Sequence, residues 1–152
     1  MTPVSLPVWF PNRYLQGAAV NPNDSNDLFI GVNGFSRRFT EGPGAGIGHV
    51  FESKDGGLNW TDISTNIPDI PVNDVVVLSD GSLAVATDLG VVYRAAGQTS
   101  WTRLGTGLPT TTVMDLSIGP DGNLYAATHG RGLWRIPIPA SASSPTAPAK
   151  KR

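Results

Sequence analysis

The 152-residue chain contains no cysteine, which excludes a disulfide framework, a Cys-ligated zinc or iron–sulfur site and a cysteine nucleophile. Lysine and glutamate, which commonly fill exposed helix faces, occur only three times and twice. No segment approaches 18 consecutive apolar residues, so the sequence predicts no membrane insertion. A formal net charge of −1 argues against electrostatic binding to nucleic acid or to an anionic membrane surface.

Glycine and proline are abundant instead, with 18 and 13 copies. Short runs of Val, Leu, Ile, Tyr and Trp alternate with Gly, Pro and Asp-Gly pairs, and no window shows sustained helical spacing of apolar residues. This pattern is typical of many short strands joined by tight turns, as in a β-meander, sandwich or propeller. The sequence therefore predicts an all-β fold.

An internal repeat makes the prediction more specific. When the chain is shifted by 41 positions, residues 60–94 align without a gap with residues 101–135, and 12 of the 35 pairs are identical. They include Trp60 with Trp101 and the Asp-Gly pairs at 80–81 and 121–122. A period of about 41 with four strand signals per unit fits one propeller blade. We therefore expect a partial β-propeller of about three four-stranded antiparallel blades, with the last blade incomplete.

The strands and units follow from this alignment. The expected strands are 17–20, 28–32, 50–53 and 60–63, then 72–78, 83–87, 91–94 and 101–104, and finally 113–118, 124–128 and 133–136. Residues 1–12 are expected to be the end of a preceding blade or a closing (Velcro) strand. The blades are expected at 13–71, 72–112 and 113–139, and the Ala/Ser/Pro-rich stretch 140–152 is expected to be a disordered tail.

One segment carries a recognisable motif: residues 53–60 read Ser-Lys-Asp-Gly-Gly-Leu-Asn-Trp. This resembles the Asp box of the BNR (bacterial neuraminidase repeat) β-propellers, a family that includes sialidases, GH74-type enzymes and sortilin-type receptors. The resemblance implies a structural role for Ser53, Asp55, Gly57 and Trp60: Asp55 caps the hairpin, the glycines permit positive φ, and Trp60 packs between blades. It also favours an extracellular or cell-envelope location, although the first ten residues lack signal-peptide features.

A four-stranded meander sends its loops alternately to two ends of the sheets. The end that carries the loops between second and third strands also carries the blade-to-blade loops, and it holds the mixed charged and histidine residues of the chain. Long loops on short-loop scaffolds commonly carry function, and 33–48 is the longest. His49, Asp74 and Asp115 share this end, with backbone capping expected for the two aspartates. The candidate binding residues are Arg37, Arg38, Glu41, Asp88, His129 and Arg131.

The sequence offers no complete catalytic set. The two histidines are 80 positions apart and no carboxylates cluster, so neither a metal site nor a cofactor is expected. Glycosidases generally need two opposed carboxylates, which cannot be assigned here. We therefore expect a segment that is not catalytic by itself. If it belongs to an enzyme, the resemblance implies a glycoside hydrolase.

Three functions stay open from sequence: a module that binds carbohydrate or protein, the non-catalytic C-terminal blades of a secreted glycoside hydrolase, and a purely structural array. Because propellers close with typically 4–8 blades, about three blades need further partners. The missing blades are expected from a parent chain, from self-association of two arcs, or from closure of the third blade by residues 4–10.

Overall fold

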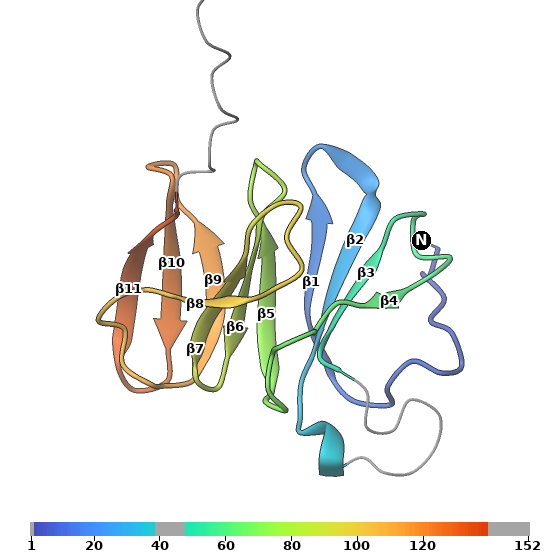
Figure 1. Ribbon diagram of the computed structural model, residues 1–152, viewed down its shortest axis with the longest axis horizontal. Coiled ribbons are helices and arrows are strands. Elements are labelled where there is room, and N and C mark those ends of the chain that lie inside the picture. The colour runs from blue at the N-terminus through green and yellow to red at the C-terminus, as the bar shows by residue number, and fades with distance from the viewer. Residues whose placement is uncertain (1, 39–47, 140–152) are drawn as a thin grey trace, which may run out of the picture.

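The computed structural model describes residues 2–38 and 48–139. These residues form eleven strands in three antiparallel sheets that stand side by side as an open arc (Figure 1), and they include no α-helix. The all-β prediction is confirmed, with two sheets of four strands and one of three.

The first sheet has the order β1-β2-β3-β4. Its strands are β1 (Leu15–Asn21), β2 (Asp24–Val32), β3 (Val50–Ser53) and β4 (Thr61–Asp62). Asn21 pairs with Asp24 across a tight turn, in which Asn21 Oδ1 accepts the Asn23 N–H at 3.0 Å. The short 3₁₀ helix η1 (Ser36–Arg38) follows β2.

The second and third sheets repeat this plan. The second sheet contains β5 (Val72–Val77), β6 (Leu83–Thr87), β7 (Gly90–Arg94) and β8 (Thr102–Leu104) in sequential order. The third contains β9 (Val113–Ile118), β10 (Asn123–Thr128) and β11 (Gly132–Pro137), with β10 in the middle. Every expected strand is present, and the main difference is in β2, which begins four residues before the expected position.

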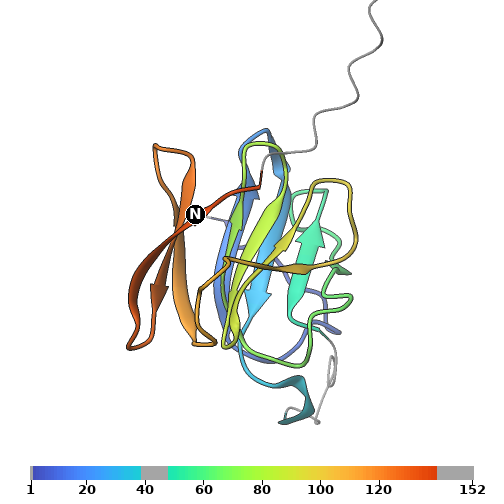
Figure 2. The ribbon, with the colours of Figure 1, turned by 60° about the vertical axis from the view of Figure 1, so that its left-hand side comes forward.

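The core lies between the sheets: one apolar cluster joins the first and second sheets, and another joins the second and third. β6 is buried along its whole length, as expected for a strand of the middle sheet. By contrast, β11 is exposed at four of its six positions. Figure 2, turned so that the side with the third sheet comes forward, shows that sheet at one end of the arc.

The two repeated tryptophans differ in their packing. Trp101 packs between the first and second sheets, as expected, and its Nε1 donates to the Ile63 carbonyl at 2.9 Å. Trp60 donates instead to the Gly57 carbonyl at 3.1 Å and packs against Phe10 from the N-terminal segment. Residues 2–13 form no strand and lie against the first sheet, so they do not supply the outer strand of the third sheet.

Candidate functional site

One end of the three sheets, which we call the loop face, carries the loops at 33–38, 48–49, 64–71, 88–89, 105–112 and 129–131. It is the lower end in Figure 1, and it matches the end at which the sequence places its candidate residues. Arg37 and Arg38 form the last two residues of η1 and are exposed. Glu41, the third candidate binding residue of this loop, lies outside the described residues.

The carboxylate of Asp69 organises this part of the loop face. Its two oxygens accept the backbone N–H groups of Ser36 at 2.6 Å and Arg37 at 3.3 Å. The same carboxylate receives the His49 ring at 3.0 Å and lies 3.6 Å from the Arg37 guanidinium. Partial burial acts to raise the pKa of Asp69, but the hydrogen bonds outweigh it and lower the pKa to about 2. Asp69 is therefore a permanent anion that fixes the η1 turn.

His49 connects Asp69 to a buried arginine. The ring is 2% exposed, and its Nδ1 lies 3.2 Å from Arg13 Nη1. Because a guanidinium can only donate, Nδ1 accepts from Arg13, and Nε2 carries the proton that is donated to Asp69. Burial first, and then the Arg13 charge, lower the pKa of His49 below its usual value. Both ring nitrogens are engaged, so His49 has no free nitrogen to act as a general base.

Arg13 completes the network from the start of the first sheet. It donates to the carbonyl groups of Gly34 at 3.0 Å and of Gly48. The guanidinium thus joins both ends of the loop between β2 and β3. Desolvation by burial lowers the pKa of Arg13, although Asp69 and Asp62 oppose the shift, and the group remains a cation at neutral pH.

An open pocket of about 430 Å³ lies beside this network. Its carboxylate and hydroxyl groups already serve the backbone: Asp62 accepts the N–H of Gly48 and of Ser64, and the Ser64 hydroxyl accepts those of His49 and Val50. The pocket is lined by Ser36, Gly48, His49, Asp62, Ser64, Thr65, Ile67 and Asp69.

The two loop arginines surround an aromatic ring. The guanidinium carbons of Arg37 and Arg38 lie 4.9 Å and 5.5 Å from the centre of the Phe35 ring. Such stacking is weakly stabilising and limits the positions of long cationic side chains. Phe35 itself packs against the core between the first and second sheets. The turn therefore presents two positive groups from an anchored base.

The remaining candidates are not brought together with this turn. Asp88, in the turn between β6 and β7, accepts a hydrogen bond from Asn73 Nδ2 of β5, in the same sheet, at 3.2 Å. His129 and Arg131 are exposed in the β10–β11 turn, at the other end of the arc in Figure 1. The Arg131 carbonyl accepts the Trp134 Nε1–H at 2.8 Å. The structure thus separates one candidate surface, at Arg37 and Arg38, from the residues of the third sheet.

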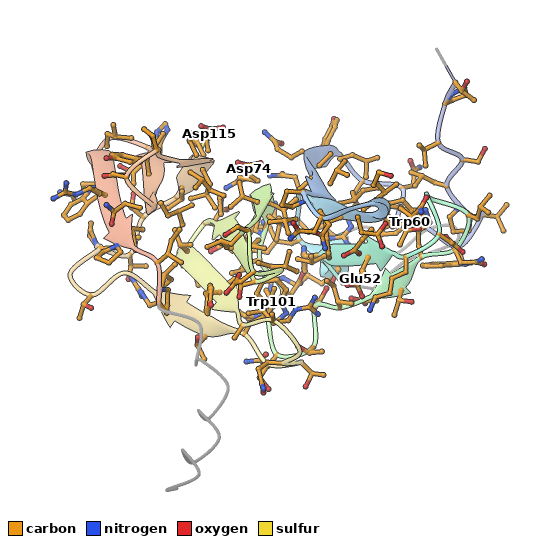
Figure 3. The ribbon with its side chains drawn as sticks, turned by 90° about the horizontal axis from the view of Figure 1, so that it is seen from above. Glu52, Trp60, Asp74, Trp101 and Asp115 are labelled. Carbon is orange, nitrogen blue, oxygen red and sulfur yellow. The ribbon has the colours of Figure 1, made fainter. Side chains whose placement is uncertain are left out.

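The two repeated aspartates have unequal surroundings, although Figure 3 shows both along the same side of the molecule. Asp74 accepts the N–H of Val75 at 2.8 Å and the N–H of Leu116, in the next sheet, at 2.9 Å. Burial raises the pKa of Asp74 against the effect of these two hydrogen bonds. Asp115 is exposed at the corresponding position of the third sheet.

The opposite end, which we call the turn face, carries the Ser53–Trp60 segment. The Asp55 carboxylate accepts the Asn59 N–H at 2.8 Å and the Ser53 hydroxyl at 2.9 Å, and the hydrogen bonds from Asn59 lower its pKa. The Ser53 oxygen accepts the Gly57 N–H at 2.8 Å. Gly57 has a φ of 94°, a conformation that favours glycine. Each of these polar groups forms its hydrogen bonds within the Ser53–Trp60 segment.

Sequence reasoning missed Arg13 and Asp69, and it also missed Glu52 on the turn face. Glu52 lies 3.7 Å from Arg94, whose guanidinium stacks over Trp101 at 5.3 Å. The repeat gives no signal for Asp69, because Thr110 stands at its aligned position.

Within residues 2–38 and 48–139, no group of three or more His, Asp or Glu side chains is arranged to hold a metal ion. The same residues contain no helix with the length and apolarity needed to cross a membrane.

Comparison with known proteins gives structural relatives only. No family model matches the chain, and no curated protein matches its sequence. Among solved structures, a GH74 enzyme from Niastella koreensis superposes with a TM-score of 0.61 at 16% identity, over 80% of this chain and 21% of that one. An ancestral GH74 enzyme gives a TM-score of 0.55 at 23% identity, over 77% of this chain and 17% of that one.

A third neighbour is the extracellular domain of a putative one-component system from Bacteroides thetaiotaomicron. Its TM-score is 0.60 at 12% identity, with 88% of this chain and 16% of that chain covered. The chain therefore spans between 16% and 21% of the length of these three neighbours. The likeness is one of fold: the chain is a segment of a β-propeller whose sheets do not close into a ring.

Proposed function

We propose that this chain is a BNR-type propeller segment that acts as a binding module, with the anchored Arg37–Arg38 turn as its contact surface. The observation that carries the proposal is the Asp69 network. It fixes the backbone of η1 through two N–H groups and leaves the two guanidinium groups exposed. A surface that is ordered before binding loses less entropy when a ligand arrives.

The chemistry of the described residues favours binding over catalysis. Asp69 is a permanent anion, and His49 uses both ring nitrogens within the fold. Asp74 has a raised pKa, as a general acid would, but its two oxygens are held by the N–H groups of Val75 and Leu116. Asp69, His49 and Asp74 thus supply no free acid–base pair of the kind that glycoside hydrolysis needs.

The BNR assignment rests on the Ser53–Trp60 segment. Its Ser, Asp and Gly side chains and backbone close a turn between the third and fourth strands of a sheet. This is the structural role that the resemblance to an Asp box implies. The segment lies on the turn face, away from the arginines, so the proposed binding surface does not depend on it.

The chemistry of the surface indicates an oxygen-rich ligand. Guanidinium groups bind carboxylates in bidentate fashion and donate to hydroxyl and carbonyl oxygens. Beside them, the open pocket is lined by Ser36 and Thr65. Their hydroxyls donate to Asp69 and to the Thr99 carbonyl and can still accept from a ligand hydroxyl. A carbohydrate that carries carboxylates or many hydroxyl groups fits this combination, and so does an acidic protein surface.

A second candidate function is suggested by the structural neighbours. Two of them are GH74 enzymes, and this chain corresponds to about a fifth of their length. In this alternative the chain supplies non-catalytic blades to a larger glycoside hydrolase, whose catalytic carboxylates come from other blades. The Arg37–Arg38 turn would then contact the substrate at the rim of the active site.

The test is a glycan array followed by calorimetry on the whole chain. The double variant Arg37→Ala plus Arg38→Ala is expected to lose at least tenfold in affinity for the best array ligand. Its melting temperature should stay unchanged, because alanine keeps the backbone N–H groups that Asp69 accepts. Lys54→Ala, which removes an exposed cation from the turn face, is the matched control and should bind normally.

Binding that survives the double variant would place the contact surface elsewhere. If no glycan binds the chain, a protein partner remains, and the same double variant can be compared with the chain in capture from an acidic-protein mixture. Hydrolysis of the array ligand by the chain alone would contradict the assignment as a non-catalytic module.

A further inference from the structure

The N-terminal segment aligns with the end of a blade, with Pro11 shared by all three stretches and Leu6 shared with Leu104. Residues 3–11 align without a gap with residues 60–68 and with residues 101–109. Leu6 then matches Ile63, directly after β4, and Leu104, at the end of β8, and Pro11 matches Pro68 and Pro109. Between them, Phe10 matches Ile67 and Leu108 in the loop that leads to the next blade.

The structure supports this alignment at Phe10. Ile67 is buried in the core against the second sheet, and Leu108 is buried in the core against the third. Phe10 is buried in the same way against the first sheet, where its ring lies 4.6 Å from that of Phe51. Residues 10–11 therefore occupy the place of a blade-to-blade loop, although the described chain has no blade before them.

The fourth-strand part of the same segment lacks its sheet. Ile63, directly after β4, and Leu104, at the end of β8, are 7% and 8% exposed, whereas Leu6 is 37% exposed. Residues 2–5 lie over the turn at 56–58 instead of pairing with a strand. A segment that aligns with an outer strand thus stays unpaired within the described chain.

The third sheet, in turn, lacks a fourth strand among the described residues. In the first two sheets the third strand pairs with a fourth, whereas β11 pairs with β10 alone among the described residues. An unpaired edge presents free N–H and C=O groups and favours addition of a strand. Leu133 on this edge strand is 69% exposed.

The inner side of the third sheet gives an independent indication that another sheet docks there. Asp74 of the second sheet accepts an N–H from Leu116 of the third. Asp115, its repeat equivalent, presents an exposed carboxylate where the N–H of a following sheet would arrive. Met114 and Ile118 on the same strand are each 44% exposed.

We propose that two copies of this chain associate head to tail, with residues 3–6 of each copy added as the fourth strand beside β11 of the other. The first sheet of each copy then follows the third sheet of its partner. Two arcs of three sheets give six, within the usual range for closed propellers. The exchange must occur between copies, because the N-terminal segment packs on the first sheet and the second sheet separates it from the third.

The register of the added strand follows from the repeat. In the second sheet Val91 pairs with Leu104, and Val92 pairs with Arg103. The same pairing in the third sheet places Gly132 opposite Leu6, and Leu133 opposite Ser5 of the partner copy. The addition would cover Leu133 and bury Leu6 as Leu104 is buried.

Multi-angle light scattering on the whole chain tests the association. We expect twice the chain mass of 16.0 kDa. Leu6→Asp should return the mass to that of one chain, because a carboxylate would be buried at the fourth strand. The matched control is Val8→Asp, two residues away at a position that is 87% exposed and aligns with the exposed Thr65 and Thr106; it should stay dimeric.

Engineered cysteines test the register directly, since the chain has none of its own. One variant carries Ser5→Cys and the other carries Leu133→Cys. Mixed under oxidising conditions, they should form a crosslinked dimer on a non-reducing gel, and Val8→Cys mixed with Leu133→Cys should form much less.

A chain that stays monomeric at high concentration would overturn the proposal. So would a dimer that is unaffected by Leu6→Asp, or one that is lost equally in both aspartate variants. If Leu6→Asp fails to fold, the cysteine pair still decides. These outcomes are independent of the proposed ligand binding, because the substituted residues lie outside the Arg37–Arg38 turn.

Discussion

At the residue scale, the most informative group is the chain of contacts from Arg13 through His49 to Asp69. Three ionisable side chains are fixed in one hydrogen-bonded line, and each holds a different loop segment. Its chemistry resembles that of a catalytic dyad, because a carboxylate orients an imidazole. Here, however, the Arg13 guanidinium donates to the second ring nitrogen, Nδ1 of His49, so the imidazole cannot act as a base. The network is therefore structural.

The pH dependence of stability should report this network. Folding lowers the pKa of His49, so below about pH 6.5 the unfolded chain binds more protons than the folded chain. The free energy of unfolding is therefore fully retained above that pH and should fall as the pH decreases below it. Urea denaturation followed by tryptophan fluorescence, repeated across this range, measures the effect.

The second histidine provides the control for this measurement. His129→Gln alters an exposed ring and should leave the pH dependence in place, whereas His49→Gln should weaken it because glutamine does not titrate. An identical decrease in both variants would assign the effect to other groups. Asp69, with a pKa of about 2, loses its contribution only as the pH falls through its usual value of about 3.8 toward 2.

Residues of this kind mark the limit of prediction from sequence. Strand positions follow from alternation and turn residues, which are local, and β3, β6 and β9 begin where the pattern predicts. Asp69 reaches His49 across 20 positions, and Arg13 reaches it across 36. Such pairs depend on how the blades stack. Because these residues do not recur at the equivalent positions of the repeat, the sequence alone gives no sign that they meet.

At the scale of the elements, polar side chains join the sheets as well as apolar ones. Asn73 at the start of β5 is 5% exposed and lies between all three sheets. Its Oδ1 accepts from Asn33 at 2.6 Å, and its Nδ2 donates to the Val113 carbonyl at 2.9 Å. The same amide donates to Asp88. One side chain therefore ties the inner strands together beside the loop face.

Loss of this amide should be costly. Asn73→Ala leaves the Val113 carbonyl and the Asn33 amide without a partner, which typically costs about 1–3 kcal/mol of unfolding free energy when the groups are buried. Asn26→Ala, at an exposed position of β2, should cost much less. Chemical denaturation of both variants gives the comparison, and equal stability would show that water replaces the lost bonds.

At the scale of the whole molecule, the arc behaves as a short repeat array, in which the terminal units need protection. The second sheet is covered on both faces, and β6 is buried throughout. The first sheet is covered on its outer side by residues 4–11, through Val4 over Gly57 and Phe10 over Phe51. The third sheet has β9 and β11 largely exposed. The repeat predicts this architecture, but the role of the N-terminal segment as a cover needed the structure.

Removal of the cover should weaken the first sheet more than the rest. Phe10 is 6% exposed and contacts Phe51 and Trp60, so Phe10→Ala should cost about 3 kcal/mol through lost burial and the cavity left behind. Trp9→Ala, at a position that is 40% exposed, is the neighbouring control and should cost much less. Hydrogen exchange should show faster opening of β2 and β3 in Phe10→Ala, while β6 stays protected, because each sheet is stabilised mainly by its immediate neighbours. Uniform acceleration in all three sheets would instead mean that the arc unfolds as one cooperative unit, in which the N-terminal cover stabilises the second and third sheets as much as the first.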